Sequence, residues 1–267
     1  MKGSALPGFG LSVGFATAFL GLVVMLPLAA LVVTAAGSGR AWQVLTDPRA
    51  VAAFKVSFGT AAVVAVLCVP LGVLLAWVLE RYRMPGRRIL DAAIDLPFAL
   101  PTAVAGIALT TLYVPEGWLG AAFARVGIEV AFTRLGIGAA LLFIGLPFVV
   151  RTVQPVLRGV DRAAEEAAMV LGASAWQVFR RIVLPQLRPA IATGAALAFA
   201  RGVGEYGSVI FIAGNRPGIT EIVPLLIVIK LEQFDIPGAA LLGTAMLALS
   251  FVLLFAINRL QAWSHAG

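Results

Sequence analysis

Arg201 and Glu205 are the residues whose types and spacing best suit an ionic substrate, because both stand inside a long apolar run. They are four positions apart, so on a helix their side chains would share one face. A charged residue at the centre of a bilayer costs about 2.5–3.5 kcal/mol on insertion scales, so the two must pair or face water. Two interpretations stay open: Arg201 lines an ion path while Glu205 limits how tightly an anion is held, or the two form a structural ion pair. Asp95, near one end of another apolar run, is a further candidate for the path.

Residues that could support enzyme or metal chemistry are scarce. Cys68 is the only cysteine and His265 the only histidine, so we expect neither an intrachain disulfide nor a zinc site. A phosphate-binding P-loop needs a lysine directly after a glycine, and none of Lys2, Lys55 and Lys230 follows one. We therefore expect no enzyme activity, no metal and no cofactor in this chain. If ATP drives its work, another polypeptide must hydrolyse the ATP.

A long polar segment, residues 151–188, interrupts the apolar chain. Asp161 can cap a helix whose small apolar residues repeat at helical spacing, and Gly172 supplies its C-terminal stop. Ser174 can cap a second helix, which Pro185 is expected to end. Both short helices would be apolar on one side and charged on the other. Such helices either pack on their own bundle or insert into a groove on another protein.

The elements that hold these residues belong to a membrane protein. The chain is 61% hydrophobic and 12% charged, whereas soluble domains carry about 25% charged residues. A helix needs about 20 apolar residues to cross a bilayer. We predict one all-α domain over residues 1–267 with six spans, the third kinked by prolines, and a short apolar run at 222–229 that does not cross. The expected spans are 11–36, 56–79, 92–114, 135–150, 190–213 and 239–257, with a coupling loop at 151–189.

The distribution of basic residues predicts the orientation. Six spans place both termini on one side, where twelve Lys and Arg residues fall, against seven on the other side. Cytoplasmic loops carry the excess of Lys and Arg, so both termini and the polar segment are predicted to be cytoplasmic. The same bias explains the net charge of +7, and we expect no nucleic-acid partner.

The polar segment carries residue types at fixed offsets that resemble the EAA loop of ABC-importer permeases. In that family the first helix of the loop is a coupling helix, which transmits ATP-driven closure of the nucleotide-binding subunits to the membrane bundle. The resemblance implies a six-span type I ABC importer fold with a cytoplasmic coupling loop. It also implies a coupling role for the matching residues, which are Glu166, Ala167, Ala168, Gly172, Ile182, Leu184 and Pro185.

Four longer stretches resemble the T-type subunit of sulfate/thiosulfate permeases: 95–106, 151–157, 204–215 and 232–235. The resemblance implies a subunit of the bacterial inner membrane that passes sulfate or thiosulfate into the cytoplasm. The implied partners are two ABC ATPase subunits, a second, W-type permease subunit, a periplasmic sulfate-binding protein and the surrounding lipid. The alternative within the class is a molybdate or tungstate permease acting as a homodimer, because those permeases share the EAA loop.

Two other classes of membrane protein fit less well. A membrane enzyme would need a nucleophile–base pair or a metal cluster, and the chain offers one terminal histidine and one cysteine in an apolar run. A passive channel would not need the EAA loop. We therefore expect a transport subunit.

Overall fold

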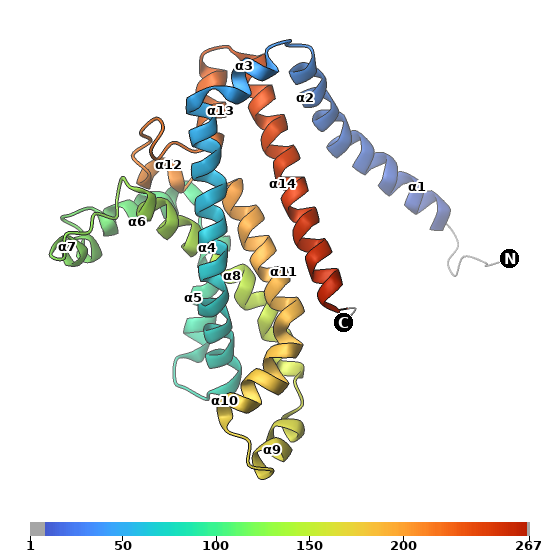
Figure 1. The fold of residues 1–267 in the computed structure, drawn as a ribbon, viewed down its shortest axis with the longest axis vertical. Coiled ribbons are helices and arrows are strands. Elements are labelled where there is room, and N and C mark those ends of the chain that lie inside the picture. The colour runs from blue at the N-terminus through green and yellow to red at the C-terminus, as the bar shows by residue number, and fades with distance from the viewer. Residues whose placement is uncertain (1–8, 266–267) are drawn as a thin grey trace.

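The centre of the molecule is a bundle of three long helices (Figure 1). They are α4 (Pro48–Arg81), α8 (Arg134–Gly159) and α11 (Leu184–Val203), and each packs against the other two. The computed structural model describes residues 9–265, and within them every regular element is helical. The all-α prediction is confirmed for this part of the chain.

Small residues allow the three helices to pack closely. A Cβ added to Gly72 of α4 would lie 2.6 Å from Cγ1 of Val149 on α8. A Cβ added to Gly194 of α11 would lie 2.4 Å from Oγ1 of Thr152 on α8. Helices in lipid associate through such close packing, because the lipid tails are as apolar as the helices themselves.

The first helical arm lies largely outside this bundle. It consists of α1 (Phe9–Leu20), a π-helical turn (Gly21–Met25) and α2 (Leu26–Ala36). The α2 segment packs on α14 (Ile236–His265), whereas α1 stands away from the bundle in Figure 1. A short helix, α3 (Ala41–Thr46), then leads into α4. The arm is long and apolar enough to cross a membrane, at the place of the predicted first span.

The predicted third span is broken rather than kinked. It consists of α5 (Arg87–Ala99) and α6 (Thr102–Tyr113), whose axes differ by 115°. Pro101 has no N–H and disfavours helical backbone at the residue before it, and Leu100 is extended with ψ of 136°. Pro97 lies inside α5 without breaking it. The prediction of one continuous segment was therefore wrong at the second proline.

The predicted fifth span also differs from the structure. Its helix α11 ends at Val203, and the chain becomes helical again only in α12 (Val209–Ile212). The intervening residues 204–208 form a non-helical break. Glu205 therefore lies beyond the end of α11, and not on the helix that the four-residue spacing with Arg201 suggested.

The expected helix end at Pro185 is a third correction. The helix α10 (Ala175–Val178) runs through a π-helical turn (Phe179–Val183) straight into α11, as one 29-residue segment. The N–H of Leu184 bonds to the carbonyl of Phe179, and Leu184 keeps helical backbone angles of −57° and −40°. This wide turn places Pro185 in the first turn of α11, where its missing N–H interrupts no regular bond.

Hydrogen bonds and ion pairs fix the end of the bundle near α3. The helix α13 (Val223–Glu232), at the place of the predicted short apolar run, packs on α14 and α4. The guanidinium of Arg49 donates to the buried carboxylate of Glu221 at 2.8 and 2.6 Å. Lys230 donates to Asp235 at 3.1 Å, and this bond holds the pKa of the Asp235 carboxyl below its usual range.

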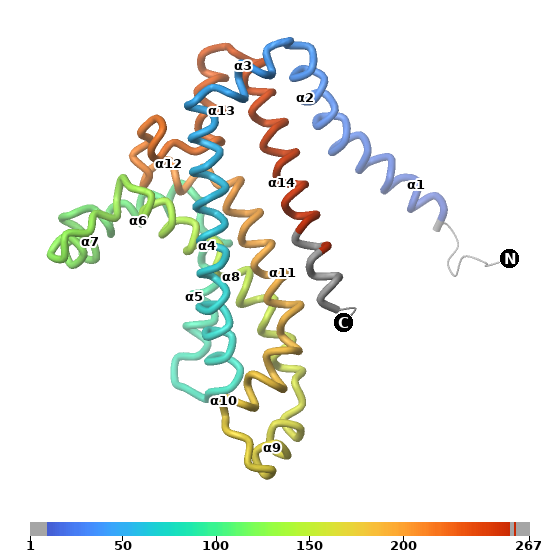
Figure 2. Tube along the Cα trace, viewed as in Figure 1, coloured from blue at the N-terminus to red at the C-terminus, as the bar shows by residue number. Residues whose placement is uncertain are grey.

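The path of the chain separates two ends of the molecule (Figure 2). The helices α9 (Arg162–Val170) and α10 and the turn between α4 and α5 lie at one end, whereas α3 and α13 lie at the other. The helices α6 and α7 (Trp118–Ala124) extend sideways between these ends. This arrangement groups two of the predicted cytoplasmic segments, the α4–α5 turn and the polar segment, at one end.

Candidate functional site

The helix α9 has well-defined ends. Asp161 accepts a hydrogen bond from the Ala163 N–H at 2.9 Å and so caps its start. Its last turn closes on Gly172, whose φ of 88° lies in the left-handed region. The N–H of Gly172 bonds to the Met169 carbonyl and the N–H of Ala173 to the Ala168 carbonyl, both at 3.0 Å. This is a Schellman motif, and the predicted stop at Gly172 is confirmed.

The second helix of the segment begins with a capping box. The Gln177 side chain accepts the Ser174 N–H at 2.8 Å, and the Ser174 hydroxyl accepts the Gln177 N–H at 3.3 Å. Because α10 continues into α11, a movement of the turn at Gly172 would reach the far end of α11 along one helix. Rigid elements with discrete positions are the physical means by which distant sites are coupled.

An apolar surface faces outward at this end of the molecule. Val170 and Leu171 are 87% and 88% exposed, and Met169 and Trp176 are exposed as well. The helix α9 projects beyond the bundle and lies against α10. Packing of this surface on the chain's own bundle is therefore not what the structure shows. An exposed apolar patch of this kind is typical of a docking surface for another protein.

The seven residues predicted to couple transport fall into two groups. Glu166 and Ala167 are exposed on α9, Ala168 is half-buried beside them, and exposed Gly172 ends the helix. The other three, Ile182, Leu184 and Pro185, lie at the junction of the π-helical turn and α11.

The break between α11 and α12 is organised around Glu205. This carboxylate is 2% exposed and pairs with the Arg201 guanidinium at 2.5 Å. Its other oxygen accepts the N–H and the hydroxyl of Ser208 at 2.8 and 2.9 Å. The side chain of Arg201 remains 35% exposed. Glu205 therefore stabilises the backbone at the break, while the guanidinium of Arg201 remains accessible on one side.

The two broken helices meet at their breaks. A Cβ added to Gly106 of α6 would lie 2.5 Å from the Ser208 carbonyl oxygen, and one added to Gly207 would lie 2.1 Å from Oγ1 of Thr102. Sequence reasoning missed this crossing, although Pro101 at one break and Gly204 and Gly207 at the other were its signal. Broken helices at the midplane are where many transporters bind their substrates.

Substitution of Gly106 by alanine is expected to destabilise the protein, because the new methyl group would meet backbone that cannot rotate away. Overpacking of this kind costs about 1–3 kcal/mol. Gly138→Ala is the matched control, since its Cβ would lie 3.8 Å from Cγ2 of Val64. Thermal unfolding of the purified variants in detergent measures the difference. Equal midpoints for the two variants would contradict the close crossing.

Asp95 of α5 lies in a network of charges that also includes residues of α8 and α4. Arg151 of α8 donates to both Asp95 oxygens at 2.8 and 2.7 Å and to Asp91 at 2.7 Å. Arg151 also donates to Gln154, which in turn donates to Glu80 of α4 at 2.8 Å. The network joins three helices, and it binds the carboxylate that we had considered for the ion path.

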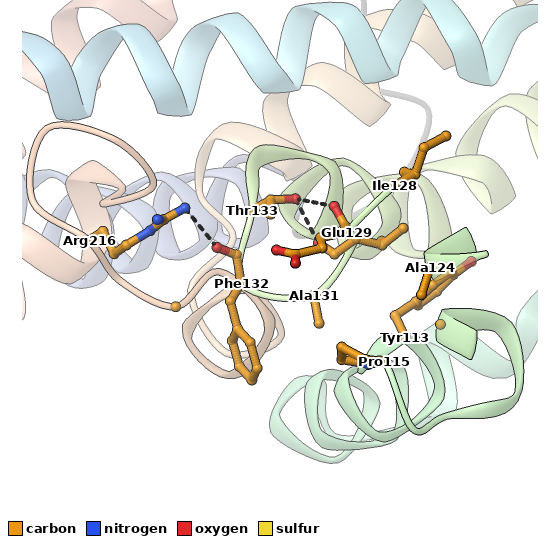
Figure 3. Close-up of a pocket in the computed structure, with 12 residues that line it drawn as sticks. Tyr113, Pro115, Ala124, Ile128, Glu129, Ala131, Phe132, Thr133 and Arg216 are labelled. Atoms are coloured by element: carbon orange, nitrogen blue, oxygen red, sulfur yellow. Dashed lines mark hydrogen bonds between the residues drawn. The ribbon is translucent and has the colours of Figure 1, made fainter. Parts of the chain in front are cut away.

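A cavity of about 510 Å³ that the sequence did not indicate lies beside α7, and Figure 3 shows residues that line it. Tyr113, Glu129, Phe132 and Arg216 lie on its wall. The guanidinium of Arg216 donates to the Phe132 carbonyl at 3.3 Å. Because one acid and one base face this cavity, its charge does not favour an anion over a cation.

Comparison with known proteins places the chain in a family. Residues 68–266 match the binding-protein-dependent transport system inner membrane components. The sulfate transport system permease protein CysT of Escherichia coli is 49% identical over 259 residues, which is 96% of this chain and 94% of that protein. CysT of Synechocystis is 49% identical over 249 residues, covering 92% and 87% of the two chains.

Solved structures show the same fold at low sequence identity. A bacterial ABC transporter that imports alginate superposes with a TM-score of 0.77 at 16% identity, covering 95% of this chain and 94% of the other. An amino acid ABC transporter gives a TM-score of 0.53 at 15% identity, covering 81% and 92%. The chain thus belongs to the family of binding-protein-dependent transport system inner membrane components, and its fold is that of a type I ABC importer permease.

Proposed function

We propose that this chain is a permease subunit of a bacterial ABC importer that carries sulfate or thiosulfate into the cytoplasm. The observation that carries the proposal is the 49% identity to sulfate permeases over 96% of the chain. The exposed apolar surface of α9 supports it, because an importer permease needs a docking surface for its motor. The molybdate or tungstate alternative gains no support from these relatives.

The coupling role rests on the α9 segment. We infer that Glu166, Ala167, Ala168 and Gly172 dock on an ATPase subunit, which closes when it binds ATP. The movement then passes through α10 into α11 and reaches Arg201 and the break beyond it. The ATPase is a separate polypeptide in this account, because no lysine of this chain follows a glycine.

Arg201 suits a path for a dianion that must not be held tightly. Its guanidinium is partly exposed, while Glu205 neutralises most of its charge from a buried position. A path of this kind attracts an anion weakly, which permits release. In this proposal high affinity belongs to a periplasmic sulfate-binding protein. Related support comes from an alginate ABC transporter structure in complex with a periplasmic protein that carries alginate.

The remaining parts of the proposal concern assembly and orientation. The complete importer would contain two ATPase subunits, this chain and a second, W-type permease subunit. The positive-inside rule predicts that α9 and both termini are cytoplasmic. The grouping of α9, α10 and the basic α4–α5 turn at one end of the bundle supports this orientation.

Purification of the tagged chain from its native membrane tests the proposed assembly. We expect two ATPase subunits and one different permease subunit to accompany each copy of this chain. Native mass spectrometry gives the stoichiometry. A complex with two copies of this chain and no second permease would contradict the heterodimer and favour the homodimer.

A further inference from the structure

Arg81, at the end of α4, forms an ion pair with Glu165 of α9. Both side chains are 12% exposed, so water screens the pair little. Among the described residues, it is the only ion pair that α9 makes with the rest of the chain. Glu165 stands directly before the residues that resemble the EAA motif, in the first turn of α9.

Aromatic side chains hold Arg81 in place. Its guanidinium lies over the Trp77 ring, 5.3 Å from the centroid. The Trp77 ring meets the Phe179 ring edge-on at 5.4 Å, and Phe179 stacks on Trp176 at 5.6 Å. The last turns of α4 therefore contact α9 through the Arg81–Glu165 ion pair. They contact the π-helical turn after α10 through the rings of Trp77 and Phe179.

The preceding residue, Glu80, joins the same turn of α4 to the bundle. Its carboxylate accepts hydrogen bonds from Gln154 and Arg158 of α8, both at 2.8 Å. Gln154 also accepts a bond from Arg151 at 2.6 Å, and Arg151 holds Asp95 of α5. The last turn of α4 is thus connected to two helices. Arg81 pairs with α9, and Glu80 is linked through Gln154 and Arg151 of α8 to α5, which leads to the α5–α6 break.

Without Arg81, α9 would be tied to the bundle mainly by its two chain connections and by its contact with α10. The turn at Gly172 has a glycine at its centre, so α9 could tilt about it without moving α4. With the ion pair intact, any displacement of α9 must either carry the end of α4 along or separate two poorly hydrated charges. Separating such charges is costly, because neither regains full hydration.

We propose that Arg81 is a positioning residue for coupling: its ion pair with Glu165 makes α4 and α5 follow α9. Closure of the motor then reaches both broken helices, α11 directly and α6 by way of α4 and α5. The inference rests on the proposed function, since it requires that α9 docks on an ATPase.

The test uses the complete importer in liposomes with its binding protein, and it measures sulfate transported per ATP hydrolysed. We expect Arg81→Gln and Glu165→Gln each to lower this ratio about tenfold, the size expected within a coupling network. ATP hydrolysis itself should persist. The exchange Arg81→Glu with Glu165→Arg should restore most of the ratio. Arg83→Gln is the matched control, because Arg83 is an exposed arginine in the non-helical segment just after α4, and it should leave the ratio unchanged.

Glu166→Lys, assayed alongside, separates the possible failures. If it abolishes transport while Arg81→Gln keeps the normal ratio, the ion pair has no coupling role and the proposed function stands. If both single variants lower the ratio but the charge exchange does not restore it, the pair is not the cause and the proposal is overturned. If Glu166→Lys transports normally, the docking role of α9 fails, and this inference fails with it.

Discussion

Replacing Gly172 with proline is expected to abolish sulfate uptake while the chain still inserts and assembles. Gly172 has φ of 88°, whereas the proline ring fixes φ near −65°. Proline also removes the N–H that bonds to the Met169 carbonyl. The proline would destabilise the turn by about 3 kcal/mol, so the correct geometry of α9 would be populated roughly a hundredfold less. Uptake of labelled sulfate by cells that express the variant measures the loss.

Gly172→Asn is the matched control for this substitution. Asparagine tolerates the left-handed region better than other residues with a side chain, and it keeps the N–H. We expect this variant to retain most of the uptake. If the proline variant transported normally at equal membrane abundance, the turn would have no role in coupling, and the movement would have to pass elsewhere.

Glu205→Ala is expected to lower the stability of the folded protein, and this is the second largest effect that we predict. The buried carboxylate satisfies Arg201 and two donors of Ser208, and all three would lose their acceptor. Breaking a buried ion pair from one side costs about 3–5 kcal/mol, and the partial exposure of Arg201 favours the lower end. Thermal unfolding of the purified variant in detergent measures the loss. An unchanged midpoint would mean that the break does not depend on Glu205.

Arg201→Gln is the companion variant that separates structure from transport. It removes the guanidinium but leaves both Ser208 bonds to Glu205 in place. If Arg201 lines the path, uptake per assembled complex should fall, whatever the loss in abundance of the complex. Normal uptake and normal ATPase coupling in a stable complex would rule out a path role and leave the structural ion pair.

The helix ends of the coupling segment could be predicted because their causes are local. Asp161, Gly172 and Ser174 act on backbone groups within a few residues, so their types at these positions are sufficient. The end at Pro185 was predicted wrongly for an equally local reason. A π-helical turn before Pro185 changes the hydrogen-bonding pattern, so that the missing N–H breaks no regular bond. No residue type predicts such a turn from sequence.

The contacts within the candidate site could not be predicted in the same way. Arg81 and Glu165 are 84 positions apart, and Arg151 and Asp95 are 56 apart. Each acid has several basic residues at its end of the bundle, and only the packing of α4, α5 and α8 selects the partner. The sequence therefore could not predict that Arg151 holds Asp95, and the path role of Asp95 stays a prediction. The crossing of the two breaks likewise depends on how distant helices pack.

The most direct test of the account is sulfate accumulation by liposomes that contain the complete importer and receive sulfate-loaded binding protein. We predict that sulfate accumulates only when ATP is supplied on the α9 side, and that Glu166→Lys abolishes accumulation in an otherwise intact complex. Accumulation without ATP, or undiminished accumulation in the Glu166→Lys complex, would contradict the conclusion that α9 couples this permease to an ATPase.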